Sequence, residues 1–277
     1  MQLIQVEQDT FRLPRRRRDA HKGDFGRVFI LAGSVGYTGA PIFAANAAVR
    51  TGSGLVFLGV PEEIWSVVAL KCAEAMPYPL ERDLDAILKH ISGSAAVLVG
   101  PGLGLGAGEL VRSLVPRIDQ PLVLDADGLN ALSGHMQLLD ARTAPTVLTP
   151  HEGEFARLTG CSLPVADRTA AARELAAAHN CTVVLKGYRT VTAAPDGRVW
   201  VNTTGNPGMA KGGSGDVLAG MILSLIGQGI TASESAAMAV WLHGRAGDLA
   251  AQRFGEYSMT PSDLLDELPR AMMELSE

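Results

Sequence analysis

The chain has 277 residues, of which 47% are hydrophobic and 19% charged, so it can bury a large core without disulfide or metal support. Its formal net charge of −5 argues against a nucleic-acid-binding protein, because such proteins neutralise phosphates with an excess of Lys and Arg. The three scattered cysteines indicate a reducing compartment, and the sequence has neither a signal-peptide pattern nor an apolar run of membrane-spanning length. We therefore predict a cytoplasmic protein without nucleic-acid or membrane partners.

Short apolar runs alternate with helical patterns along the chain. Each run is apolar nearly throughout, which is typical of strands in a parallel sheet that helices cover on both faces. The predicted strands comprise residues 27–32, 54–60, 95–100, 121–126, 146–150 and 182–187. The predicted helices comprise residues 41–50, 108–115, 169–179, 216–226, 233–253 and 261–275. The alternation predicts an α/β protein, a three-layer α/β/α sandwich with a mostly parallel central sheet.

One segment departs from this alternation. Residues 191–202 contain two strand-like pieces around Pro195-Asp196-Gly197, a turn sequence that predicts a β-hairpin. No linker, low-complexity tract or internal repeat divides the chain. We therefore expect a single domain over residues 1–277, in which the hairpin leads into a glycine-rich segment.

That segment, GNPGMAKGGSGDVLAG from Gly205 to Gly220, is a glycine loop followed by an apolar helix. Its glycines allow positive φ angles and close approach of a ligand to the backbone. The N-terminus of a helix offers unpaired N–H groups and partial positive charge, which favour an anion such as phosphate. We predict a helix that begins at Asp216, beside an anion-binding loop that includes Lys211; the alternative is an Asp216 that only caps the helix.

Polar side chains follow three of the predicted strands, where loops of a parallel sheet commonly form a site. Asp125 and Asp127, after the fourth strand, either hold Mg²⁺ through their oxygens or are cap and turn residues. His151 and Glu154, after the fifth, either face one pocket or are a solvated histidine and a helix-capping acid. Lys186 closes the sixth strand, as a phosphate contact or as a surface cation.

Other features are ambiguous when read alone. Arg15–Arg18 form a run of four arginines, which we interpret as a solvated segment rather than a nucleic-acid site. His243 lies on a largely apolar helix, where a packed side chain and a ligand-binding role are equally compatible with the pattern. Segments 33–40 and 100–106 are rich in glycine, but neither carries a P-loop ending or a dinucleotide fingerprint.

Six segments, in this order, carry a family resemblance: KGDFGRVFILAGSVGYTGAPIFAANAA, VGPGLG, LDADGLNAL, LTPHEGEFARL, LKG and GNPGMAKGGSGDVLAG. They resemble the ADP/ATP-dependent (S)-NAD(P)H-hydrate dehydratases, which are similar in fold to the ribokinase-like superfamily. NPGMAKGGSGD is the most specific motif, and the resemblance implies a dehydratase domain without the N-terminal epimerase domain of two-domain relatives. Two positions depart from the family pattern: Glu152 stands where proline is usual and changes the charge near His151, and Gly128 stands where alanine is usual.

The resemblance implies ADP-dependent repair of hydrated nicotinamide cofactors, (6S)-NADHX and NADPHX, to NADH and NADPH with release of AMP and phosphate; eukaryotic members use ATP. Asp216 would be the catalytic base that deprotonates the C6 hydroxyl, which then attacks the terminal phosphoryl group. The positions that match substrate contacts are Ala40, Gly102, Gly104, His151 and Asp216. Those that match nucleotide and phosphate contacts are Lys186, Gly187, Tyr188, Arg189, Thr190, Gly212, Gly213, Ser214 and Gly215. For Mg²⁺, Glu154 is the first candidate and Asp127 the second.

Two other functions are considered. A ribokinase-like kinase for a vitamin precursor would share the glycine-loop aspartate but not the NPGMAKGGSGD motif. A non-enzymatic nucleotide-binding protein would not need Asp216. The Ala-rich helices suggest a subunit interface, and the resemblance implies a homotetramer. The sequence leaves open the choice between ADP and ATP and between NADHX and NADPHX.

Overall fold

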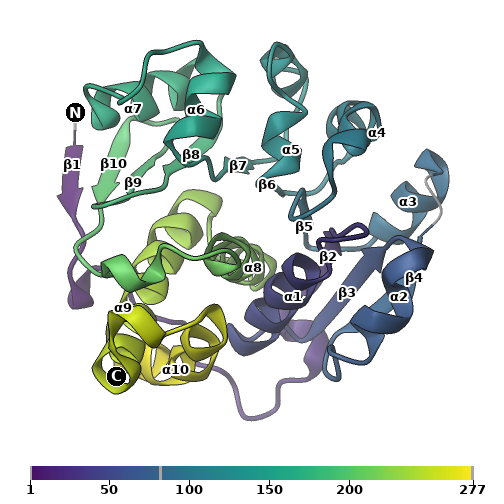
Figure 1. The fold of residues 1–277 in the computed structure, drawn as a ribbon, viewed down its shortest axis with the longest axis horizontal. Helices are drawn as coiled ribbons and strands as arrows, with labels where there is room; N and C mark the ends of the chain where they lie inside the picture. The colour runs from purple at the N-terminus through teal and green to yellow at the C-terminus, as the bar shows by residue number, and fades with distance from the viewer. Residues whose placement is uncertain (1, 81–82, 276–277) are drawn as a thin grey trace.

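A sheet of ten strands forms the centre of the protein, and in Figure 1 it runs from left to right in the order β1-β10-β9-β8-β7-β6-β5-β2-β3-β4. The computed structural model describes residues 2–80 and 83–275. Neighbouring strands are parallel except at β9, which is antiparallel to both β8 and β10. The strands are β1 (Gln2–Gln5), β2 (Arg27–Leu31), β3 (Leu55–Val60), β4 (Met76–Pro79), β5 (Ala96–Val99), β6 (Leu122–Leu124), β7 (Thr146–Leu148), β8 (Thr182–Leu185), β9 (Val191–Ala193) and β10 (Arg198–Val201).

Helices cover both faces of this sheet (Figure 1). One layer contains α1 (Gly39–Arg50), α2 (Glu62–Ala69), α8 (Ser214–Gly227), α9 (Ala232–Ser258) and α10 (Pro261–Glu274). The other contains α3 (Leu84–Ile91), α4 (Gly108–Leu114), α5 (Asp127–Asn130), α6 (Glu152–Thr159) and α7 (Arg168–Ala178). Alternate strand residues serve the two layers: in β2, Val28 and Ile30 pack in one core, and Phe29 and Leu31 in the other. The predicted three-layer α/β/α sandwich is confirmed.

The six predicted strands and the hairpin are present, each ending within two residues of its predicted bounds. Two further strands, β1 and β4, were not predicted from the sequence. β4 contains Pro77 and Pro79 and pairs only with β3, at an edge where proline is tolerated. β1 forms the opposite edge, in parallel with β10, so its pairing depends on residues almost two hundred positions away in the chain.

The Ala-rich helices pack within the chain. Four of the five alanines of α1 and most of those of α9 are buried, and α1 lies so close to α8 that a Cβ at Gly220 would come within 2.1 Å of the Ala44 carbonyl oxygen. Helix α9 extends five residues beyond its predicted end, with a kink at Gly255 (φ 72°). These alanines therefore reflect intrachain packing and do not by themselves indicate a subunit interface.

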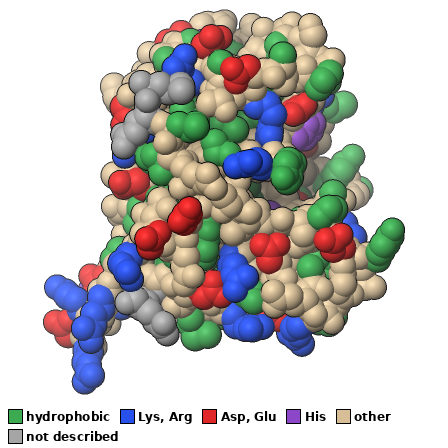
Figure 2. All heavy atoms as spheres, turned by 90° about the vertical axis from the view of Figure 1, so that its left-hand side faces the viewer, with side chains coloured by type: hydrophobic (Ala, Val, Ile, Leu, Met, Phe, Trp, Pro, Cys, Tyr) green, Lys and Arg blue, Asp and Glu red, His purple; other side chains and the backbone are tan. Residues whose placement is uncertain are grey.

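The four arginines of the Arg15–Arg18 segment are exposed, as expected for a solvated segment. Arg16 anchors it: the guanidinium lies 4.0 Å from the Phe25 ring centroid and donates to the Gly52 carbonyl at 2.7 Å. Figure 2 shows a group of basic side chains projecting from the lower edge of the molecule, whereas acidic and basic side chains are interspersed over the rest of that face. Among the described residues, no helix is long and apolar enough to cross a membrane.

Candidate active site

A large cavity opens at the carboxyl ends of β6, β7 and β8. It encloses about 1140 Å³. Small-molecule sites typically measure roughly 300–1,000 Å³, so this one has room for a nucleotide and part of a second ligand. The turn after β6, the start of α6, the loop 186–190 and most of the segment 202–216 line it. Asp216, His151 and all nine residues expected to contact nucleotide or phosphate are among the lining residues.

The other three residues expected to contact substrate lie outside the lining of this cavity: Ala40 is in the first turn of α1, and Gly102 and Gly104 are on the loop that follows β5. A Cβ at Gly102 would lie 3.0 Å from the Cβ of Ala40, and Ser34 Oγ donates to the Gly102 carbonyl at 2.8 Å. Gly104 follows on the same loop, and its N–H donates to the Asp127 carboxylate at 2.8 Å. The expected substrate contacts thus form two groups: Asp216 and His151 line the cavity, whereas Ala40, Gly102 and Gly104 lie outside its lining.

The glycine loop ends in a left-handed Gly213 (φ 102°), and α8 begins directly after it at Ser214. The prediction that the helix begins at Asp216 is therefore wrong by two residues, because Ser214 and Gly215 already belong to the first turn. The N–H groups of Gly215 and Asp216 donate to no other described residue. A Cβ at Gly215 would lie 3.4 Å from Lys186 Nζ, so these free donors and the ammonium group face the same space.

Helix α9 holds the glycine loop in place. The Asp248 carboxylate accepts hydrogen bonds from the Gly205 N–H at 3.0 Å and from the Asn206 amide at 3.1 Å. Lys211, expected to lie beside the anion, instead donates its ammonium protons to the carbonyls of Tyr257 and Met259 at the end of α9. Its role in the structure is to cap a helix C-terminus, where a cation is favourable.

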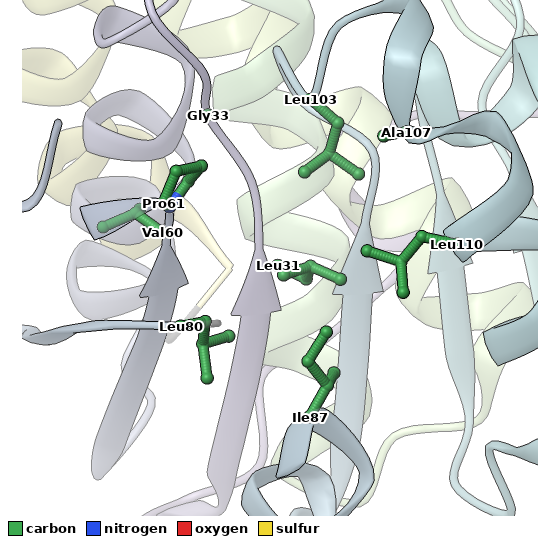
Figure 3. A pocket seen from close by; sticks show the side chains of 9 residues that line it. All are labelled: Leu31, Gly33, Val60, Pro61, Leu80, Ile87, Leu103, Ala107 and Leu110. Atoms are coloured by element: carbon green, nitrogen blue, oxygen red, sulfur yellow. The ribbon is translucent and has the colours of Figure 1, made fainter. Parts of the chain in front are cut away.

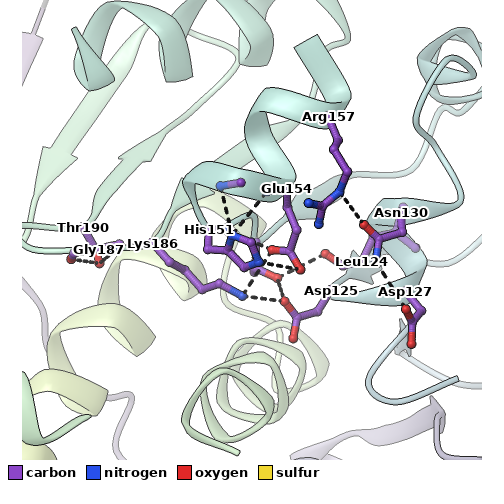
Figure 4. Close-up of polar contacts among 12 residues, drawn as sticks. Leu124, Asp125, Asp127, Asn130, His151, Glu154, Arg157, Lys186, Gly187 and Thr190 are labelled. Carbon is purple, nitrogen blue, oxygen red and sulfur yellow. Dashed lines mark hydrogen bonds and ion pairs between the residues drawn. The ribbon is translucent and has the colours of Figure 1, made fainter. Parts of the chain in front are cut away.

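Lys186 lines the cavity and lies beside Asp125 (Figure 4). Its Nζ lies 2.8 Å from Asp125 Oδ1 and 3.9 Å from Glu154 Oε2, and Thr149 Oγ1 donates to the same Asp125 oxygen at 2.7 Å. Burial by itself lowers the pKa of Lys186, but the carboxylates of Asp125, Glu154 and Asp216 outweigh it and raise the pKa. Lys186 is therefore a largely buried, charged ammonium group with 20% of its side chain exposed, which does not fit the interpretation as a surface cation.

Asp216 has an unusually high proton affinity for a carboxylate. Its pKa is raised from 3.8 to about 7, mainly by burial and also by the negative charge of Asp125, while the positive charge of Lys186 acts in the opposite direction. A group with a pKa near neutrality can both take up and release a proton at physiological pH. Such a perturbed carboxylate in a cavity is typical of a catalytic residue.

His151 and Glu154 form a capping box at the start of α6, as one of the two interpretations predicts. His151 Nδ1 accepts hydrogen bonds from the backbone N–H groups of Gly153 and Glu154. Glu154 Oε2 in turn accepts one from the backbone N–H of His151 at 2.8 Å. The same histidine lines the cavity, so both interpretations hold. The carboxylate of Glu152 turns to Arg168 Nε at 3.2 Å, so its charge is paired at α7.

The turn after β6 is strained and unusually tight. Ala126 adopts φ 48° and ψ −115°, a conformation that costs about 1–3 kcal/mol in a non-glycine residue. A Cβ at Gly128 would meet the Val99 carbonyl oxygen at 2.5 Å, which explains a glycine at this departure from the family pattern. We call residues 125–127 the elbow. It directs Asp125 to Lys186 and Asp127 to the Gly104 N–H.

A second, much smaller cavity of about 20 Å³ lies between β2, β3 and the loop that begins at Gly100 (Figure 3). Its lining is almost wholly apolar, from Leu31 and Val60 at the strand ends to Leu103 and Leu110. A water molecule would fit but would lack hydrogen-bond partners. This cavity is therefore a packing void beneath the loop that begins at Gly100 rather than a binding site.

Several residues around the main cavity had no definite role assigned from the sequence. Arg168 donates to the carbonyls of Leu185 and Tyr188 and so holds the loop 186–190, but nothing in its helical sequence context signals this role. Thr149 could have been found, because it ends the strand next to that of Asp125. His243, ambiguous from sequence, is buried and lies 3.2 Å from Ser214 Oγ.

The carboxylates fit Mg²⁺ only in a limited way. Within residues 2–80 and 83–275, no three His, Cys, Asp or Glu side chains gather as a metal-binding cluster. Mg²⁺ does not require one, since it commonly keeps several waters and binds one or two carboxylates together with substrate phosphates. Both candidates are already engaged by protein groups: Glu154 accepts the His151 backbone N–H and lies 3.9 Å from Lys186, and Asp127 accepts from Gly104 and Asn130.

Comparison with known proteins identifies the family. The model of the NAD(P)H-hydrate dehydratase family matches residues 28–270. The chain belongs to this family. It is 41% identical to the ADP-dependent (S)-NAD(P)H-hydrate dehydratase of Neisseria meningitidis serogroup B, over 91% of this chain and 87% of that protein. It is 44% identical to the bifunctional NAD(P)H-hydrate repair enzyme Nnr of Moorella thermoacetica, over 96% of this chain and 52% of that enzyme. The chain thus spans about half the length of the bifunctional relatives it matches.

Solved structures agree with this assignment. The ADP/ATP-dependent NAD(P)H-hydrate dehydratase of Bacillus subtilis, co-crystallised with ATP/Mg²⁺, superposes with a TM-score of 0.85 at 33% identity, covering 96% of this chain and 95% of that one. A ribokinase-like superfamily protein from Enterococcus faecalis superposes with a TM-score of 0.87 at 29% identity, covering 99% and 96%. The predicted family and the ribokinase-like fold are both confirmed.

Proposed function

We propose that this protein dehydrates (6S)-NADHX and NADPHX to NADH and NADPH, consuming ADP and releasing AMP and phosphate. The observation that carries the proposal is Asp216, whose burial raises its pKa to about 7 beside the free N–H groups at the start of α8. The family relationship supports the reaction type, and the relative from Neisseria meningitidis is named for ADP dependence.

In the proposed reaction, Asp216 accepts the proton of the C6 hydroxyl while that oxygen forms a bond to the terminal phosphorus of ADP. The bond from this phosphorus to the oxygen bridging the two phosphates breaks, and AMP leaves with the electron pair. Phosphate then departs from C6, a proton is lost from the adjacent carbon, and the dihydropyridine double bond is restored. Phosphorylation makes a poor leaving group into a good one, and the transfer needs mainly positioning and charge stabilisation.

The chain's own residues have distinct roles in this proposal. The N–H groups at Gly212–Gly215 and the Lys186 ammonium stabilise the charge on the transferring phosphoryl group. Residues 187–190 hold the nucleotide, and Ala40, Gly102, Gly104 and His151 hold the hydrated cofactor. Bound Mg²⁺ would neutralise phosphate charge. Glu154 is the residue proposed to orient its water ligands, and Asp127 is the second candidate.

The decisive assay incubates the protein with hydrated NADH, Mg²⁺ and either ADP or ATP and follows the absorbance of reduced nicotinamide. We expect recovery of NADH with stoichiometric AMP when ADP is supplied. Asp216→Asn should lower the rate at least about 100-fold. The matched control, Asp85→Asn, alters an exposed surface ion pair with Arg117 and should leave the rate unchanged.

Other results of this assay would contradict specific parts of the proposal. Absence of NADH recovery with both nucleotides would refute the dehydratase assignment. Phosphorylation of a vitamin-precursor alcohol in its place would favour the kinase alternative. An unaltered rate in Asp216→Asn would refute the role of Asp216 as base. A homotetramer and a cytoplasmic location are further proposals, tested by light scattering and by cell fractionation.

A further inference from the structure

His243 occupies a position that packing alone does not explain. It lies on α9 among apolar neighbours, Val240, Trp241 and Leu242, and only 9% of its surface is exposed. It lines the cavity, and its Nε2 lies 3.2 Å from Ser214 Oγ at the start of α8. An aliphatic side chain could fill this volume without the cost of burying polar nitrogens. The contact with Ser214 gives this buried imidazole a polar partner.

The charge state of His243 restricts what this contact can be. The pKa of His243 is lowered to about 4, mainly by burial and also by the positive charge of Lys186, while the Ser214 backbone acts in the opposite direction. The ring is neutral at physiological pH, so one nitrogen donates a hydrogen bond and the other accepts. If Nε2 accepts, the Ser214 hydroxyl donates its only proton to the ring. If Nε2 donates, that proton is free for another acceptor.

We propose that His243 is a positioning residue: its Nε2–H donates to Ser214 Oγ and so directs the Ser214 hydroxyl proton toward the phosphate that α8 binds. An anion at the free N–H groups of Gly215 and Asp216 would select this arrangement, because the opposite one would present oxygen lone pairs to a negative charge. The proposal rests on the proposed function. It adds the Ser214 hydroxyl, which His243 on α9 holds in place, to the backbone N–H donors at the start of α8.

The test is a double-mutant cycle between Ser214 and His243. Ser214→Ala and His243→Leu should each weaken Mg·ADP binding, measured by calorimetry, by about 10- to 100-fold, as expected for a lost hydrogen bond to a charged group. The double variant should be no weaker than either single variant, because His243 acts through Ser214. His243→Gln places an amide N–H near the Nε2 position and should restore binding to within about threefold of the wild type.

Two controls separate this role from a structural one. His135→Leu removes an exposed histidine elsewhere and should change neither binding nor melting temperature. If His243→Leu fails to fold, His243→Met takes its place in the cycle. Multiplicative losses in the double variant, or a His243→Gln variant as weak as His243→Leu, would overturn the proposal. Calorimetry needs no turnover, so this outcome is distinguishable from a wild type that fails to recover NADH.

Discussion

Replacing Asp216 by Asn is expected to stabilise the fold while abolishing activity. The carboxylate titrates near pH 7 in the folded protein instead of 3.8, a difference of about three units. At about 1.4 kcal/mol per unit, keeping Asp216 ionised costs the folded state on the order of 4 kcal/mol. Because the side chain is partly exposed to the cavity, we expect about 2–4 kcal/mol. A neutral amide of the same shape avoids this cost.

The stability difference between Asp216→Asn and the wild type depends on pH, because folding raises the pKa of Asp216. Below about pH 4 both states bind the proton, and the substitution is nearly neutral. Between about pH 4 and pH 7 the unfolded chain releases the proton while the folded protein keeps it, so the wild type loses stability relative to Asp216→Asn. Above about pH 7 the difference stays constant.

Urea unfolding of the wild type and the variant across this range measures the difference directly. Asp85→Asn, whose carboxylate is 82% exposed, serves as the control and should show no comparable change with pH. The reasoning is refuted if Asp216→Asn is no more stable than the wild type near pH 8, or if its advantage is already complete at pH 4.

Three further predictions test other parts of the structure. Asp125→Asn removes a negative charge that raises the pKa of Asp216, so the acidic limb of the pH profile of kcat/KM should shift to lower pH, by about one unit. Gly213→Ala would force a side chain into a left-handed conformation with its Cβ 2.8 Å from the Phe43 ring, and it should lower both ADP affinity and stability, the latter by about 1–3 kcal/mol in denaturant titrations. Arg142→Met leaves unpaired the carbonyls of Val115, Ile118 and Gln120, so it should destabilise the fold by about 2–4 kcal/mol without changing the KM for ADP, which steady-state kinetics would reveal.

The sequence predicts most of the fold because each buried strand is a continuous apolar run with a turn behind it. The two missed strands lack that signal. β1 gains its place only by pairing with a distant hairpin, and the prolines of β4 weaken any strand pattern. The first turn of α8 was also missed, because Ser214 and Gly215 have loop-like identities and become helical only after the left-handed Gly213.

Several residues of the site could be predicted from the sequence, but the contacts between them could not. The end of each strand could be identified, so Asp125, His151 and Lys186 were all recognised as residues of strand-end loops. Their pairing could not be, because it depends on β6, β7 and β8 being adjacent in the sheet. Lys211 was recognised as part of the glycine loop, but the sequence does not show that its long side chain reaches the end of α9.

The elbow at Ala126 has a mechanical consequence. One short turn carries both the acid that holds Lys186 and the acid that holds the Gly104 loop, with a single strained residue between them. Because the two carboxylates are only two residues apart, we expect a displacement of the Gly104 loop to change the position of Asp125 relative to Lys186.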